Sequence, residues 1–131
     1  MTLRHTNPDS IHPTSGYTHI VEATGGRTVY ISGQIAFDRE GKLVGEGDMR
    51  AQAEQVFANL KAALEAAGGE FEHLVKVVSY VADMAQLGAF REVRTKYLSG
   101  PNPPASTLLG VTALALPAFL VEVDAIAVIP D

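Results

Sequence analysis

The sequence predicts an α+β fold, in which two helices lie on one face of a mixed β-sheet. The only two acids of Phe119–Ile129 fall two residues apart in an apolar run, which matches the side-chain period of a strand. From Asp48 onward the apolar period changes to 3.6 residues, which is typical of a helix. The expected order of strands, helix, strand, helix and two strands favours both helices on one side of the sheet.

The N-terminal third predicts an antiparallel meander. After a polar lead rich in turn formers, side chains alternate along Tyr17–Ala23, which indicates the first strand. Gly25-Gly26 then predicts a tight turn into a strand at Thr28–Phe37, and Asp38–Lys42 is typical of a hairpin loop. Gly33 lies inside the second of these strands, so we expect either a β-bulge or a close backbone approach there.

Two helices follow, separated by one interior strand. Asp48 is the expected N-cap of the first helix, and Gly68-Gly69 is its expected stop. The β-rich run Leu74–Ala82 suits a strand inside the sheet. The second helix is expected to be capped by Asp83 and to end at Gly100-Pro101.

The last strand places Glu122 and Asp124 on one face. Its other face is apolar and predicts the core, through Val121, Val123, Ala125, Ala127 and Ile129. A lone buried carboxylate costs several kcal/mol, on the order of 2 to 7 for a polar group without a partner. Each acid therefore needs a cation, N–H donors, water or a subunit boundary, or else simply faces solvent. We take Glu122 as the acid/base candidate because its strand neighbours desolvate it, and expect Asp124 to lie nearer solvent or to be paired.

Composition excludes several classes of protein. The 131 residues are 47% hydrophobic, which indicates one globular domain over 1–131. A net charge of −5 with scattered basic residues argues against nucleic acid as a partner. Without cysteine there is no disulfide, thiolate nucleophile or cysteine-zinc site, and the four histidines share no metal-ligand spacing, so we expect no metal. We expect a cytoplasmic protein without a signal peptide or a membrane span, because no apolar run reaches about 18 residues.

Two features of the expected fold lack a partner within the chain. The sheet face opposite the helices has no cover within one chain, so oligomerisation is the natural expectation. On the second helix, Arg91 and Arg94 lie within the apolar stripe. Either their aliphatic stems cover the core while the charged ends reach water, or the two guanidiniums bind an anion or a carboxylate.

Six motifs together carry a resemblance to a known family: Gly16–His19, Ile31–Ile35, Gln55–Ala62, Val81–Met84, Pro104-Ala105 and Val121–Ala127. Over about Gly16 to Val128 the chain resembles the RidA/YjgF family of reactive-intermediate deaminases. The resemblance implies a chorismate-mutase-like fold and a homotrimer. In such a trimer the sheets form a central barrel, the helices lie outside, and a ligand cleft lies between each pair of subunits.

The resemblance also implies a chemistry. Active members hydrolyse 2-imino and 2-enamino acids to 2-keto acids and ammonia without metal or cofactor. By this resemblance Glu122 is the carboxylate near the reacting water, Tyr17 is the pocket tyrosine, and Ser32 with Gly33 forms the pocket turn. Active members read Pro-Ala-Arg-Ser where this chain has Ser106 and Thr107, so the arginine that pairs with the substrate carboxylate is absent.

Two hypotheses for function remain open from the sequence. The first is a RidA-like homotrimer with an intersubunit pocket for a small metabolite. It acts as a deaminase or hydrolase on imine, enamine or related C–N substrates other than the usual 2-imino acids. In it Ser106 and Thr107 line the pocket, and Arg91, with Arg94 as the weaker candidate, replaces the missing cation. The second is a non-catalytic ligand-binding or regulatory trimer with the same fold. The ribonuclease name that some family members carry fits poorly with the net charge.

Overall fold

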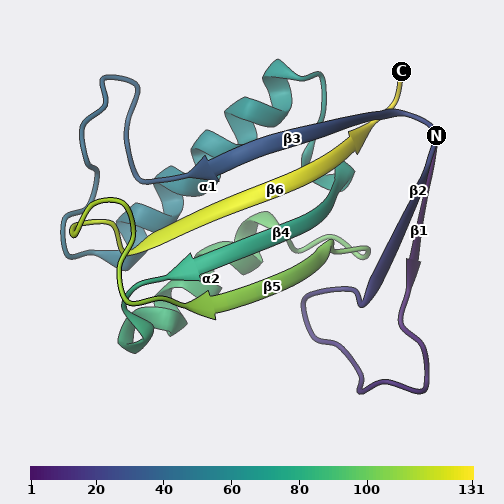
Figure 1. Ribbon diagram of the computed structural model, residues 1–131, viewed down its shortest axis with the longest axis horizontal. Helices are drawn as coiled ribbons and strands as arrows, with labels where there is room; N and C mark the ends of the chain where they lie inside the picture. Colours follow the sequence, from purple (N-terminus) through teal and green to yellow (C-terminus); the bar gives the residue numbers. More distant parts are fainter.

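The computed structural model describes residues 1–131 and contains a four-stranded sheet, two helices and a separate two-stranded arm (Figure 1). The sheet order is β3-β6-β4-β5, with β4 and β5 parallel and the other pairs antiparallel. Both helices lie on one face, so the predicted α+β architecture is confirmed. The strands are β1 (Thr2–Thr6), β2 (Ile20–Thr24), β3 (Arg27–Gln34), β4 (Leu74–Val81), β5 (Ala105–Gly110) and β6 (Val121–Ile129); the helices are α1 (Met49–Ala66) and α2 (Leu87–Tyr97).

The core lies between the helices and the inner face of the sheet. The alternation of β6 is as predicted, because its odd-numbered residues from Val121 to Ile129 are all buried. The rings of Phe57 on α1 and Tyr97 on α2 stack with centroids 5.2 Å apart, and Phe57 also stacks on Phe90 at 6.1 Å. These aromatic contacts fix α2 beside α1.

The helix termini follow the sequence signals closely. The Asp48 carboxylate accepts a hydrogen bond from the Ala51 backbone N–H at 3.2 Å, and α1 ends just before the two glycines. The Asp83 carboxylate caps a 3-10 turn, Met84–Gln86, rather than α2 itself, which begins at Leu87. No helix combines the length and the apolar composition that a membrane crossing requires.

The predicted meander is wrong at its first turn. β2 does not pair with β3; it pairs in the register Thr2↔Thr24 with β1, which lies in the polar segment before the first predicted strand. β3 pairs instead with β6. Leu3 is the one apolar residue of β1, so no hydrophobic alternation marks this strand in the sequence. Alternation also identifies a strand without identifying its partner, which is why the pairing was missed.

The loop that leads into β2 is tied to the entrance of β5. β2 begins at Ile20, later than the predicted Tyr17. Thr18 donates its hydroxyl to the Pro103 carbonyl at 2.6 Å and its backbone N–H to the Pro104 carbonyl at 3.2 Å. These two bonds hold Tyr17 beside the end of α2 and the start of β5.

Candidate functional site

The Glu122 side chain lies directly against the backbone of β3 at Gly33. The β3–β6 register shifts between Ile31 and Gln34, so a bulge is present. A Cβ atom added at Gly33 would lie only 2.7 Å from the carboxyl carbon of Glu122, so any larger residue at this position would displace the Glu122 side chain. Both expectations for Gly33, the bulge and the close approach, are therefore confirmed.

The neighbouring acid on the same face is held by a tyrosine. The Tyr80 hydroxyl donates a hydrogen bond of 3.0 Å to Oδ2 of Asp124. This bond raises the pKa of Tyr80, because ionising the phenol would place two negative charges together. Asp124 is thus paired, as expected, whereas the four ion pairs of the structure do not include Glu122.

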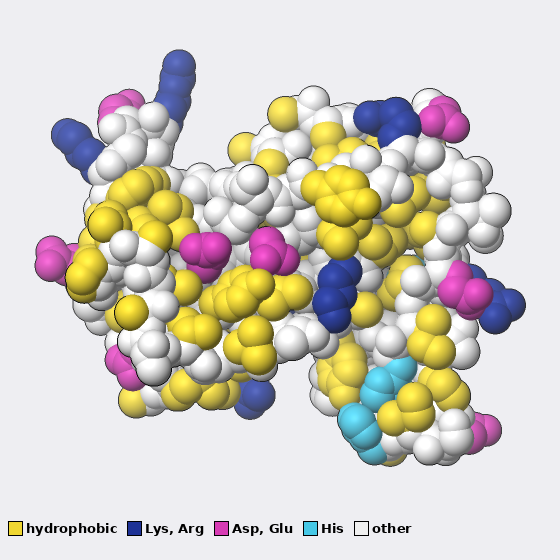
Figure 2. Space-filling view, in the orientation of Figure 1, with side chains coloured by type: hydrophobic (Ala, Val, Ile, Leu, Met, Phe, Trp, Pro, Cys, Tyr) yellow, Lys and Arg dark blue, Asp and Glu magenta, His cyan; other side chains and the backbone are white.

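The surface around these acids is apolar and uncovered. Figure 2 shows acidic side chains surrounded by hydrophobic ones on the sheet face that points away from the helices. Tyr30 on β3 is 78% exposed and Leu109 on β5 is 43% exposed. At the same face Lys76 donates to the Thr107 hydroxyl at 2.9 Å. The outer face thus lacks the cover that its apolar residues would need within one chain.

A second group of predicted residues lies on the helix side of β5. They surround a cavity of about 480 Å³ between α2, β5 and the loop that precedes β2. Its lining is polar, with two guanidiniums and several hydroxyls but no carboxylate. The lining residues are Ser15, Gly16, Tyr17, Arg91, Arg94, Thr95, Ser106 and Leu108. We call it the arginine cavity.

Arg94 is the best-fixed cation of the arginine cavity. Its Nη2 atom donates to the Gly16 carbonyl at 3.1 Å and to the Ser106 hydroxyl at 3.3 Å. Burial, and secondly the nearby charge of Arg91, lowers the pKa of Arg94. Arg91 is exposed and takes part in no ion pair. The half-buried position of Arg94 and its contact with Ser106 were not predicted by helical spacing, which treated both arginines alike.

The Tyr17 hydroxyl contacts a histidine that no sequence pattern marks as a site residue. Its hydroxyl lies 2.8 Å from Nε2 of His12. Nε2 of His19 in turn donates a hydrogen bond to the backbone carbonyl of His12. The His12 and His19 rings meet edge to face at 4.8 Å. No periodicity marks a loop residue such as His12, so only the fold reveals that it touches a site tyrosine.

The structure separates the predicted site residues into two groups. Ser106 pairs in register with Val77, which is buried beneath the helices, and so faces inward. Glu122 pairs with Tyr80 and faces outward. The outward group is Glu122, Ser32, Gly33 and Thr107; the inward group is Tyr17, Arg91 and Ser106 with Arg94. The two groups do not meet within one chain.

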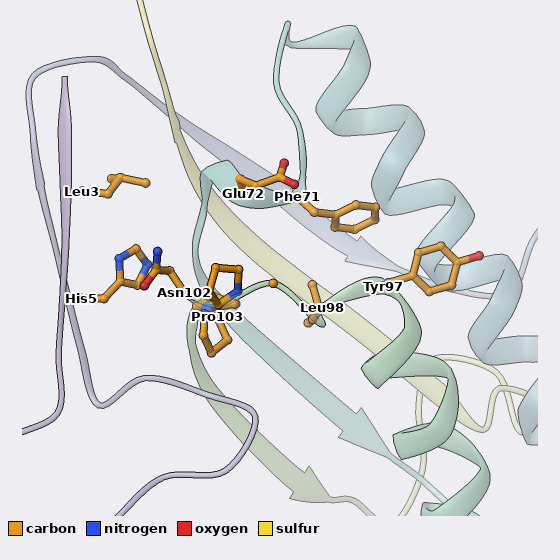
Figure 3. A pocket seen from close by; sticks show the side chains of 11 residues that line it. Leu3, His5, Phe71, Glu72, Tyr97, Leu98, Asn102 and Pro103 are labelled. Atoms are coloured by element: carbon orange, nitrogen blue, oxygen red, sulfur yellow. The ribbon is translucent and has the colours of Figure 1, made fainter.

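A further cavity, of about 280 Å³, lies between the arm and the end of α2 (Figure 3). In it Leu3 and His5 on β1 lie across from Phe71 and Tyr97. Its lining includes none of the predicted site residues. Nε2 of His5 is buried without a hydrogen-bond partner.

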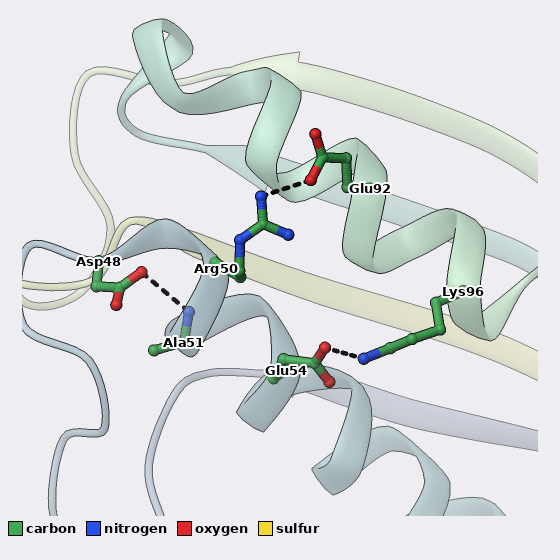
Figure 4. A network of polar contacts seen from close by, with 6 residues as sticks. All are labelled: Asp48, Arg50, Ala51, Glu54, Glu92 and Lys96. Carbon is green, nitrogen blue, oxygen red and sulfur yellow. Dashed lines mark hydrogen bonds and ion pairs between the residues drawn. The ribbon is translucent and has the colours of Figure 1, made fainter.

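The opposite side of α2 is arranged quite differently from the arginine cavity. Glu92 pairs with Arg50 of α1, and Lys96 pairs with Glu54 (Figure 4). The Tyr97 hydroxyl also donates to Glu54 at 2.7 Å. Every charged side chain on that side has a partner within the chain.

These features define an α+β protein with an acidic, apolar sheet face and a basic cavity at the edge strand. The profile of the family described as Endoribonuclease L-PSP matches residues 7–129. A crystal structure of YyfB, a Rid-family protein from Yersinia pestis, has 40% identity and a TM-score of 0.88, over 98% of this chain and 100% of that one. The crystal structure of RidA from a Psychrobacter species has 38% identity and a TM-score of 0.72, over 90% of this chain and 92% of that one.

Among sequence relatives, the 2-iminobutanoate/2-iminopropanoate deaminase of Dermatophagoides farinae is 34% identical over 93% of this chain and 92% of its own length. The chain therefore belongs to the Endoribonuclease L-PSP family, which is the RidA/YjgF family of the sequence resemblance.

Proposed function

We propose that the protein is a homotrimeric deaminase that hydrolyses small carboxylate-bearing imines or enamines in a pocket between subunits. The separation of the site residues supports this proposal. On the sheet face the Glu122 carboxylate takes part in no ion pair, and Lys76 of that face is bonded to Thr107, whereas the arginine cavity offers cations without a carboxylate. A second copy of the chain can supply to each group what it lacks, while covering the apolar face.

The observation that carries the proposal is the contact between Arg94 and Ser106. Ser106 occupies the strand position at which active family members carry the substrate-binding arginine. The Arg94 guanidinium reaches this position from α2, at 3.3 Å from the Ser106 hydroxyl. In this assignment the cation has moved from the strand to the helix, and Arg94 takes the leading role that the family resemblance assigns to Arg91.

The proposed reaction needs one base that also acts as an acid. Glu122 removes a proton from water as the water oxygen bonds to the imine carbon. The same carboxyl then gives this proton to nitrogen as the C=N double bond becomes single, which leaves a tetrahedral amino alcohol. It next carries the hydroxyl proton to the nitrogen as the C=O bond forms, so that the C–N bond breaks and neutral ammonia leaves. The absence of a side chain at Gly33 lets the carboxylate pack directly against the backbone of β3.

The alternative of a non-catalytic binding trimer has less support. A pocket plugged by a large apolar side chain such as Leu108 or Phe119 would favour it. Leu108 lines the arginine cavity, which remains about 480 Å³ in volume. Phe119 is buried against Phe37, with ring centroids 5.0 Å apart.

Ammonia release from imines generated in solution tests the proposal. We expect turnover by the wild type, loss of at least about a hundredfold in kcat for Glu122→Gln, and no change for the exposed loop variant Glu40→Gln. Light scattering should give three times the chain mass of 13.9 kDa. A monomer, or a Glu122→Gln variant with full activity, would overturn the proposal.

A further inference from the structure

The arginine cavity holds two positive charges that nothing in the chain neutralises. Neither Arg91 nor Arg94 belongs to any of the four ion pairs, and no Asp or Glu lines the cavity. The chain does not lack acids, since it has 15 Asp and Glu against 10 Lys and Arg. The absence of carboxylates is therefore a local property of this cavity.

The two cations also act on one another. They are three residues apart on α2, which places them on neighbouring positions of one helix surface. The charge of Arg91 contributes to the lowered pKa of Arg94, so the pair is repulsive as it stands. One bound carboxylate would relieve one charge and leave the other uncompensated.

We propose that the ligand of the arginine cavity is a dicarboxylate, so that the substrate is the imine or enamine of a dicarboxylic acid. This inference rests on the proposed function and specifies its substrate class. Arg94, anchored on Gly16 and Ser106, binds the carboxylate beside the reacting carbon. Arg91, at the exposed rim of the same cavity, binds the second carboxylate.

The arrangement suits two separated carboxylates better than one phosphate. The arginines differ in depth, since Arg94 is half-buried and Arg91 is exposed. A compact phosphate commonly binds at a helix N-terminus, whereas these residues lie in the middle and last turns of α2 (Leu87–Tyr97). Hydroxyls of Ser106 and Thr95 in the lining of the same cavity supply further donors.

Calorimetry with two matched probes tests the inference. 2-Oxoglutarate and 2-oxopentanoate share chain length and keto group, and differ in the second carboxylate. We expect the wild type to bind 2-oxoglutarate about tenfold more tightly, a difference of about 1.4 kcal/mol. Arg91→Gln should reduce this preference to less than about threefold, and Arg39→Gln, an exposed arginine of the hairpin loop, should retain it.

Each outcome decides between the two proposals. Equal binding of both probes by the wild type overturns the dicarboxylate inference and leaves the proposed function intact. Tighter binding of inorganic phosphate than of 2-oxoglutarate also overturns it, in favour of a compact anion. If Arg91→Gln keeps the full preference for 2-oxoglutarate, Arg91 does not bind the second carboxylate and the inference is overturned. If neither keto acid binds, the inference and the carboxylate role of the arginine cavity fail together.

Discussion

The two sides of α2 handle charge in opposite ways. Toward α1, Glu92 and Lys96 are each matched by an opposite charge, on Arg50 and Glu54. Toward β5, Arg91 and Arg94 have no acidic neighbour. The matched side is part of how the protein holds its helices together, and the unmatched side is where an anion gains most from binding. Charge that a fold leaves uncompensated is thus a better guide to function than charge as such.

The matched side itself contributes little stability. Exposed ion pairs are worth about 0.2 to 1 kcal/mol each, because both partners are well hydrated when apart. Most of the α1–α2 attachment comes from the aromatic contacts of Phe57, Phe90 and Tyr97.

Replacing the core residue of α2 should have the largest effect. Phe90 is fully buried, and Phe90→Ala is expected to lower the free energy of unfolding by about 3 to 5 kcal/mol through lost burial and a cavity. Urea denaturation at fixed protein concentration measures this. A loss as small as that of the exposed variant Glu92→Gln would show that ion pairs, not packing, hold the helix.

Removing the anchored cation should affect binding more than stability. Arg94→Ala is expected to weaken binding of 2-oxobutyrate by about thirtyfold, since a desolvated charge contact is worth on the order of 2 kcal/mol or more. Arg50→Ala removes an arginine from the matched side and should change the Kd by less than about twofold. Isothermal calorimetry on both variants compares the two sides directly, and similar losses would abolish the contrast.

Moving the cation back to the strand should restore part of that binding. Ser106→Arg in the Arg94→Ala background replaces a helix guanidinium by a strand guanidinium, and should recover about tenfold of the lost affinity for 2-oxobutyrate. In the wild-type background the same substitution adds a third cation next to Arg91 and Arg94 and should lower stability. Failure of the double variant to bind better than Arg94→Ala would place the carboxylate elsewhere.

The smallest expected effect is the acid sensitivity of the matched side. The hydrogen bond from Lys96, and next that from Tyr97, lowers the pKa of Glu54 from its ordinary value of 4.5. The stabilisation that these two hydrogen bonds give the folded state is therefore fully present above about pH 4.5. It is lost as pH falls through the lower pKa that Glu54 has in the folded state. We expect the unfolding free energies of wild type and Glu54→Gln to differ by less than about 1 kcal/mol at pH 7 and to converge as pH is lowered below 4.5 and through the folded-state pKa of Glu54. A constant difference would contradict the assignment.

Features that depend on local sequence could be predicted, and features that depend on distant partners could not. Alternation identified the outward position of Glu122, and an isolated glycine in a strand identified the bulge and close approach at Gly33. Asp48 was recognisable as an N-cap because its bond closes within one turn. Nothing local shows that β2 pairs with β1, or that Arg94 reaches Ser106 across the gap between α2 and β5.

The central position of β6 constrains the order in which the chain can fold. β6 lies between β3 and β4 and follows both in the sequence, with Arg27 opposite Ile129 at one end of the ladder. During synthesis β3 and β4 emerge first and cannot pair with each other in the native sheet, so their edges stay open until the residues of β6 leave the ribosome. Pairing over such long stretches of chain is slow to form. A nascent chain that stops before Val121 therefore has an unpaired β3, a separate β4–β5 pair and no Glu122, and the site is completed only with the strand that joins them.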